Sequence, residues 1–297
     1  MTAVLNLVVT LGMLVVVPLG LRLIPDLPGW LPRAYVVGAI PGAVALWLPR
    51  GLTASSLSTV YAVTALGLAV FGVLRVATPS ARGLAVLTAT VSPAVAATAL
   101  VAERAGYPLF GFPLRTLSLT VAHFHFAGFT AALVTGLVCA STSDSPRARL
   151  AAVCVPGGTA VVFVGFFVSD AVELAGAAVL TTGLWLAAFV IWRDVFPGVT
   201  DRATRLLLGT SAAVLVPSLL LALWWALGRA ADLPHPSVDW MIATHGVENA
   251  VGFGLCSVLA WRRLLGPAVG AGLRDLPQGS DEAARDPEPN ATGRRRG

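Results

Sequence analysis

The sequence predicts an all-α, polytopic transmembrane helical bundle of about nine spans, and three observations support this fold class. Of the 297 residues, 56% are hydrophobic and only 12% are charged, whereas an ordinary soluble domain has about 25% charged residues. The mean hydropathy is +0.81, which implies more apolar surface than a soluble fold of this length can bury. The apolar residues also form stretches of membrane-spanning length. Soluble, disordered and disulfide-bonded classes are therefore excluded.

Nine stretches approach the length of about 20 mostly apolar residues that a spanning helix needs. We expect spans near residues 3–21, 34–48, 57–74, 84–102, 117–139, 150–169, 172–191, 206–227 and 242–264. The second span is short and contains Pro41, and only a tight turn at 169–171 separates the sixth span from the seventh. Pro93, Pro156 and Pro217 lie inside spans, where neighbouring groups can compensate for the lost backbone hydrogen bond. The first stretch lacks a basic n-region and a cleavage pattern, so we expect no signal peptide.

The cationic residues predict how the chain is oriented. All twenty are arginine, and the absence of lysine excludes Schiff-base chemistry. Nine spans would place twelve arginines on one side, before the distal tail, and four on the other, namely Arg50, Arg104, Arg115 and Arg229. The positive-inside rule then puts the N-terminus outside and the C-terminus in the cytoplasm. Topology explains the net charge of +5, so we expect no nucleic-acid partner.

The composition changes near residue 273, after which Pro, Gly, Arg and acidic residues dominate. We therefore expect a transmembrane domain over residues 1–272 and a disordered cytoplasmic tail over 273–297.

Several ionisable residues lie inside the expected spans or at their ends, and such residues are candidates for function because they are costly in lipid. With the orientation above, all of them fall in the outer third of the bilayer. We expect the catalytic groups to come from His123, His125, Asp170, Glu173, His245, Glu248 and Asn249. Glu103, Phe126, Asp239 and Trp240 are the expected substrate-binding residues.

Helical spacing narrows these roles. His245 and Glu248 are three residues apart and share a helix face, which Asn249 borders. His123 and His125 are rotated by about 200° from one another, so only one of them can point into a given pocket. Structural interpretations remain open: a histidine can form a hydrogen bond across helices, Asp170 and Glu173 can cap helix ends, and Asp239 can lie in a loop.

Four of these segments, in the same order along most of the membrane region, resemble the YndJ-like family of bacterial membrane proteins. They are YPLFGFP at 107–113, LTVAHFHFAGF at 119–129, VELAG at 172–176 and WMIATHGVENAVGF at 240–253. The resemblance implies a multi-pass protein of the bacterial inner membrane, and some family members carry a transporter label. It also implies that His245 and Asn249 are the shared pair, because the position of Glu248 is often apolar in the family.

A second resemblance concerns the segment 121–126, VAHFHF, which is similar to the helix of heme–copper oxidase subunit I that ligates two hemes. That family's core uses six metal-binding histidines, whereas this chain has four histidines in total. We therefore expect no cofactor.

Three functions fit a layer of histidines and carboxylates. The first is an enzyme that isomerises or cyclises a lipophilic, isoprenoid-like or polyketide-like molecule, or opens its epoxide, by acid–base catalysis. The second is a proton-coupled transporter, although the absence of an internal repeat does not favour it. The third is a metal site formed by His123 or His125 with His245 and a carboxylate. The expected partners are the lipophilic substrate and membrane lipid.

Overall fold

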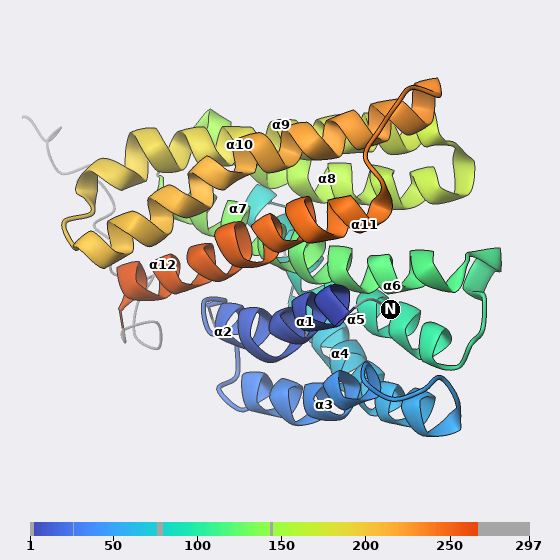
Figure 1. Cartoon of the computed structure of the whole chain (residues 1–297). Coiled ribbons are helices and arrows are strands. Elements are labelled where there is room, and N and C mark those ends of the chain that lie inside the picture. Colours follow the sequence, from blue (N-terminus) through green and yellow to red (C-terminus); the bar gives the residue numbers. More distant parts are fainter. Residues whose placement is uncertain (1–2, 26, 76–79, 143–144, 267–297) are drawn as a thin grey trace, which may run out of the picture.

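The computed structural model describes residues 3–25, 27–75, 80–142 and 145–266, and the regular elements in these ranges are all helical (Figure 1). Nine helical rods run through them. The first five are α1–η1–α2 (Ala3–Leu11, Gly12–Val16, Val17–Leu21), α3 (Leu31–Ala45), α4 (Leu52–Arg75), α5 (Ala81–Arg104) and α6–η3–α7 (Leu114–His123, Phe124–Thr130, Ala131–Ser141). The other four are α8 (Pro146–Val168), α9–η4–η5 (Asp170–Val190, Ile191–Val195, Phe196–Gly198), α10 (Arg202–Ala231) and α11–η6–η7–α12 (Val238–Met241, Ile242–Gly246, Glu248–Leu255, Cys256–Leu265). A short 3-10 turn, η2 (Leu109–Gly111), precedes α6.

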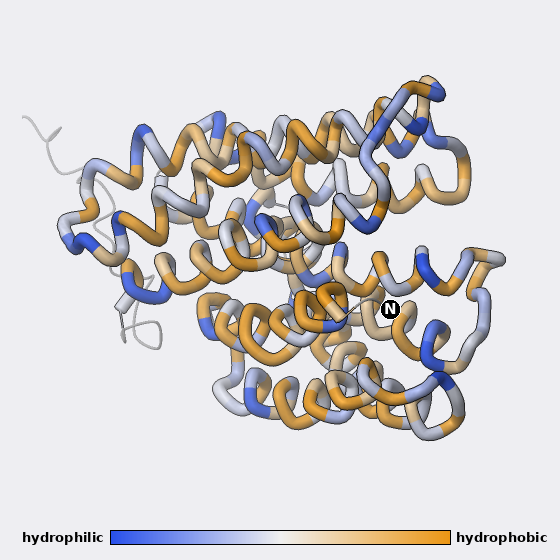
Figure 2. The backbone as a smooth tube through the Cα atoms, in the orientation of Figure 1, coloured by the Kyte–Doolittle hydropathy of each residue, from blue (hydrophilic) through white to orange (hydrophobic). Residues whose placement is uncertain are grey.

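Seven of these rods are long and apolar enough to cross a membrane, which makes this a multi-pass membrane protein. The two exceptions among the described rods are α3, an apolar helix of 15 residues, and the last rod, which carries Asp239, Glu248 and two terminal arginines. Hydrophobic residues fill the middle of the rods, and hydrophilic ones gather toward their ends (Figure 2). The expected tail at 273–297 lies outside the described residues.

Each of the nine expected ranges falls on a rod, but most rods begin several residues earlier than the apolar pattern does. The reason is capping by polar residues. The Ser80 hydroxyl accepts the Gly83 amide at 3.0 Å, and the Asp201 carboxylate accepts the Thr204 amide at 2.9 Å. Such caps satisfy backbone donors that the first turn leaves free. The apolar pattern therefore finds the middle of a spanning helix and misses its polar first turn.

The α8–α9 hairpin is the tightest helix pair. Only Ser169 separates the two helices, as the sequence predicts. A methyl group added at Gly158 would collide with the backbone of Leu180, and one at Gly165 would collide with that of Glu173. Small residues let helix backbones approach closely in lipid, where van der Waals packing drives association.

Three of the rods widen into π-helix where they cross in the middle of the bundle. The segments η1, η3 and η7 contact one another there. A Cβ atom on Gly12 would lie 3.0 Å from the Cβ of His125, and one on Gly254 would lie 2.9 Å from the Phe126 ring. π-Helical turns are rare and occur often at functional sites. We therefore expect functional polar groups at or near this crossing.

Candidate functional site

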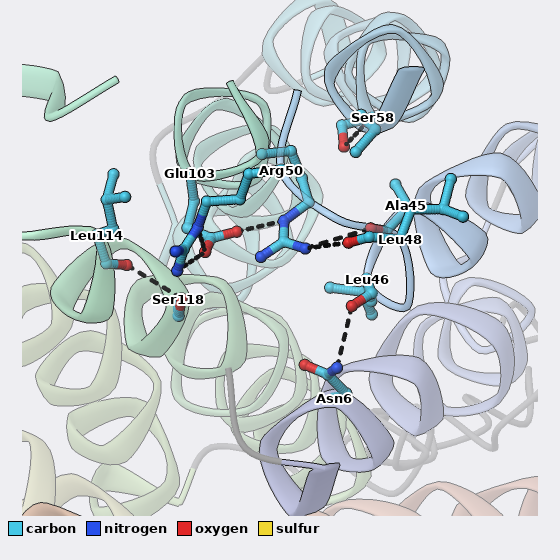
Figure 3. A network of polar contacts seen from close by, with 11 residues as sticks. Asn6, Ala45, Leu46, Leu48, Arg50, Ser58, Glu103, Leu114 and Ser118 are labelled. Carbon is cyan, nitrogen blue, oxygen red and sulfur yellow. Dashed lines mark hydrogen bonds and ion pairs between the residues drawn. The ribbon is translucent and has the colours of Figure 1, made fainter. Parts of the chain in front are cut away.

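Three of the acidic residues at the ends of the rods, Glu103, Asp170 and Asp239, form ion pairs with arginines. We use "Glu103 end" for the end of the bundle that holds Arg50, Glu103, Arg115, Asp170, Arg229 and Asp239. Glu103 is fully buried there, and its Oε1 lies 2.9 Å from Nη2 of Arg50 (Figure 3). Its Oε2 receives a hydrogen bond from Arg104, whose Nη1 also donates to the Leu48 carbonyl at 3.1 Å. Glu103 thus fastens the α3–α4 connection to the end of α5.

Two more carboxylates at this end are paired in the same way. Asp170, the first residue of α9, lies 2.5 Å from Arg229 at the end of α10. Asp239, near the start of α11, lies 2.7 Å from Arg115 near the start of α6. Glu173 is buried in the first turn of α9, where its backbone packs on Gly165. Asp170, Glu173 and Asp239 therefore occupy helix ends rather than the middle of the bundle.

His125 belongs to a hydrogen-bonded chain in the core. Its Nδ1 lies 2.6 Å from the Val121 carbonyl, which fixes the proton on Nδ1. Nε2 consequently accepts a hydrogen bond, and the Tyr61 hydroxyl donates it at 2.9 Å. The Tyr35 hydroxyl then donates to Tyr61 at 3.1 Å. All three side chains are buried. Both ring nitrogens of His125 therefore have their hydrogen-bond partners inside the protein.

His245 is held on the eighth rod by Ser218 and on its own rod by Asn249. Its Nδ1 lies 2.9 Å from the Ser218 carbonyl, so Nδ1 carries the proton. The two hydrogens of the Asn249 amide go to the nearest acceptors, the Ser218 hydroxyl at 2.5 Å and the His245 carbonyl at 2.8 Å. These contacts fix the imidazole orientation and leave the lone pair of Nε2 available for a proton. Ser218 is held as a hydrogen-bond acceptor and not as an activated nucleophile.

His123, like His245, places its Nδ1 on a backbone carbonyl, but on one of its own helix. Its Nδ1 lies 2.9 Å from the Leu119 carbonyl, which leaves Nε2 as the basic nitrogen. The helix α1 packs against both α6, which carries His123, and η6, which carries His245. Unlike His125, His123 is exposed at the surface of the bundle. Of the histidine pair in the fifth rod, His123 is the one that accompanies His245.

Glu248 differs from the three carboxylates that form ion pairs, Glu103, Asp170 and Asp239. It lies at the start of η7, three residues after His245, and its Oε2 is buried with no hydrogen-bond partner in the described part of the chain. Five other buried side-chain atoms in the described residues also lack a partner, but the Glu248 oxygen is the only carboxylate oxygen among them. A buried carboxyl oxygen without a partner calls for a ligand, a bound proton or a catalytic role. We define the His245 site as His123, Ser218, His245, Glu248 and Asn249.

The structure separates the residues that the sequence placed in one layer. Glu103, Asp170 and Asp239 form ion pairs at helix ends, and His125 faces α4. Phe126 is buried between the first and last rods, next to Gly12 and Gly254. Trp240 is largely exposed near the start of the last rod. Within residues 3–266, without the masked positions, no three His, Cys, Asp or Glu side chains come close enough to hold a metal ion.

Sequence reasoning missed Ser218, Tyr35 and Tyr61, and each had a signal. Ser218 follows Pro217 inside a span, and the chain has only three tyrosines, of which two lie in apolar stretches. A buried tyrosine hydroxyl needs a hydrogen-bond partner, so these two residues pointed to a polar group in the core.

Of three comparisons with known proteins, one found a match and two did not. The search of curated proteins returned no match, and neither did the search of solved structures. The family described as YndJ-like protein matches residues 7–253, a range that contains the complete His245 site. The match covers most of the chain, and it confirms the resemblance drawn from the motifs: this chain belongs to the YndJ-like family.

Proposed function

We propose that the His245 site performs acid–base chemistry on a lipophilic small molecule of the isoprenoid or polyketide class, isomerising it, cyclising it or opening an epoxide within it. The observation that carries this proposal is the unpartnered, buried Oε2 of Glu248, three residues after a histidine whose imidazole orientation is fixed. Such a reaction needs one group that accepts a proton, one that donates a proton and a pocket that excludes water.

The proton balance of this reaction closes without a cofactor. The Nε2 atom of His245 removes a proton from one carbon or hydroxyl of the substrate. A second group in its protonated form, the Glu248 carboxyl or the His123 imidazolium, gives a proton to another atom of the same molecule. The proton taken up by His245 then passes to that group, which restores both residues. Substrate and product then have the same composition when the step is an isomerisation, a cyclisation or an intramolecular epoxide opening.

This balance defines the experiment. Lipid extracts of membranes that contain the wild-type protein are compared with extracts that contain His245→Ala, and the product is sought as a compound of unchanged mass and altered retention time. We expect the conversion to fall by about 100-fold or more, the usual contribution of a positioned acid or base. His235→Ala is the matched control, because His235 is exposed in a loop. Equal conversion by His245→Ala would remove His245 from the mechanism.

Proton-coupled transport is the second candidate, and the Tyr35–Tyr61–His125 chain is the observation that favours it. This chain extends the polar groups from η3 through α4 to the first turns of α3. Under this alternative, the chain carries protons. Tyr61→Phe in proteoliposomes should then abolish solute-driven proton uptake that a pH-sensitive dye reports. An enzyme would keep its isomer conversion in the same variant.

We further propose that the Glu103 end faces the outside of a bacterial inner membrane, with the C-terminus in the cytoplasm. The arginine distribution supports this orientation. In a background without the three cysteines, a membrane-impermeant thiol reagent should label Leu233→Cys in intact cells. Thr200→Cys should react only after lysis, and the opposite pattern would reverse the orientation.

A further inference from the structure

At the opposite end of the bundle, which we call the Arg263 end, a cavity of about 780 Å³ lies between three rods. Arg22 enters it after α2, Asp201 and Thr204 enter from the start of α10, and Arg262 and Arg263 enter from the last turn of α12. The rest of the wall is mainly leucine. This cavity is independent of the His245 site, with which it shares the eighth and last rods but no residue.

The charges in this cavity do not balance. Arg263 is satisfied, because its Nη2 lies 3.0 Å from Asp201 and its Nε donates to the Thr204 hydroxyl at 3.0 Å. Asp201 also accepts the Thr204 hydroxyl at 2.6 Å. Arg22 and Arg262 have no carboxylate within ion-pair distance among the described residues. Three arginines and one aspartate line the cavity, which leaves a formal charge of +2.

The shape of the wall indicates what kind of anion fits. The leucines Leu23, Leu207 and Leu259 continue the apolar surface of the spans into the cavity. The arginines stand at the ends of these spans, where lipid headgroups lie. An amphiphile that carries a phosphate can therefore place its charge against Arg22 and Arg262 and its chain against the leucines. Basic pockets between membrane helices bind anionic headgroups in this way.

We propose that the cavity formed by Arg22, Arg262 and the leucine wall is a binding site for the phosphate group of an anionic phospholipid. Arginine suits phosphate because its planar guanidinium group donates two parallel hydrogen bonds. The fixed pair between Arg263 and Asp201 forms the floor of the site and keeps α10 and α12 together.

The test is a lipid titration of the purified full-length protein in neutral detergent, followed by native mass spectrometry. We expect phosphatidylglycerol to bind to the wild type and the Arg22→Gln/Arg262→Gln variant to lose about 30-fold in affinity, since each arginine contributes about fivefold at a membrane surface. Arg75→Gln/Arg82→Gln is the matched control, because it removes the same charge outside the cavity. It should bind within about twofold of the wild type.

Three outcomes would overturn the proposal. The two double variants could lose the same affinity, phosphatidylcholine could bind the wild type as tightly as phosphatidylglycerol, or inorganic phosphate at low concentration could displace the lipid completely. The last result would assign the cavity to free phosphate. Arg22→Gln alone provides the same comparison if the double variant does not fold, because Arg22 is exposed.

Discussion

Three carboxylates at the Glu103 end form ion pairs with arginines, whereas the carboxyl group of Glu248, in the same bundle, has an oxygen without any partner in the described part of the chain. Glu103, Asp170 and Asp239 each have an arginine partner, and every arginine at that end has a carboxylate. Glu248 lies within a π-helical crossing, and its Oε2 has no partner among the described residues. Paired carboxylates fasten rods to one another, whereas a carboxyl group without a partner serves no such purpose. We therefore attribute a stabilising role to the first group and, under the proposed function, a chemical role to Glu248.

The largest effect on stability should come from Glu103→Ala. The substitution leaves the buried guanidinium of Arg104 without its counterion, and breaking a buried pair costs about 3–5 kcal/mol. Denaturant unfolding in detergent measures the change. Glu248→Gln, measured alongside, should stay within about 0.5 kcal/mol of the wild type, because it breaks no ion pair. Equal losses in both variants would contradict the division between the two groups.

A smaller effect is expected for Tyr61→Phe. The substitution leaves the Nε2 atom of His125 without its donor and the Tyr35 hydroxyl without its acceptor, and an unsatisfied buried group costs about 1–3 kcal/mol. The same unfolding experiment reports it. A variant as stable as the wild type would show that the chain from Tyr35 to His125 does not contribute to folding.

Asp239→Asn should change stability by less than about 1 kcal/mol, since exposed ion pairs contribute little. Asp239 and Arg115 are both more than half exposed. Unfolding at low and high salt measures the difference, which should disappear at high salt. A loss as large as that of Glu103→Ala would mean that this pair does more than join two helix ends.

The smallest effect concerns pH at the Arg263 end. Hydrogen bonds from Thr204, together with Arg263, lower the pKa of Asp201 from 3.8 to about 2. Because the folded-state pKa is depressed, the stabilisation is present above about pH 4 and is lost as the pH falls toward 2. The difference in melting temperature between the wild type and Asp201→Asn should therefore shrink over that range. A difference that is constant from pH 5 to pH 2 would contradict the role of the ionised carboxylate.

Much of the fold could be predicted from the sequence, and the site only in part. Apolar runs located all nine rods, because the length of a spanning helix is set by the bilayer. His245 and Glu248 could be selected from the sequence because ionisable groups in lipid are conspicuous, whereas the pairing of His245 with Asn249 came from the family resemblance. The pairing of Glu103 with Arg50 could not be found, since the two residues are 53 positions apart in sequence. Helical wheels assume 3.6 residues per turn, so the π-helical crossing could not be foreseen either.

The comparison between paired and unpaired carboxylates is tested most directly by Glu248→Gln and Asp170→Asn, each measured for folded protein and for isomer conversion in membranes. Both substitutions replace one carboxylate with its amide, in Glu248 inside the last rod and in Asp170 at the first residue of α9. We expect Glu248→Gln to fold normally and to convert about 100-fold less substrate, and Asp170→Asn to keep most of the conversion. Full conversion by folded Glu248→Gln would show that the unpartnered carboxylate has no part in the chemistry.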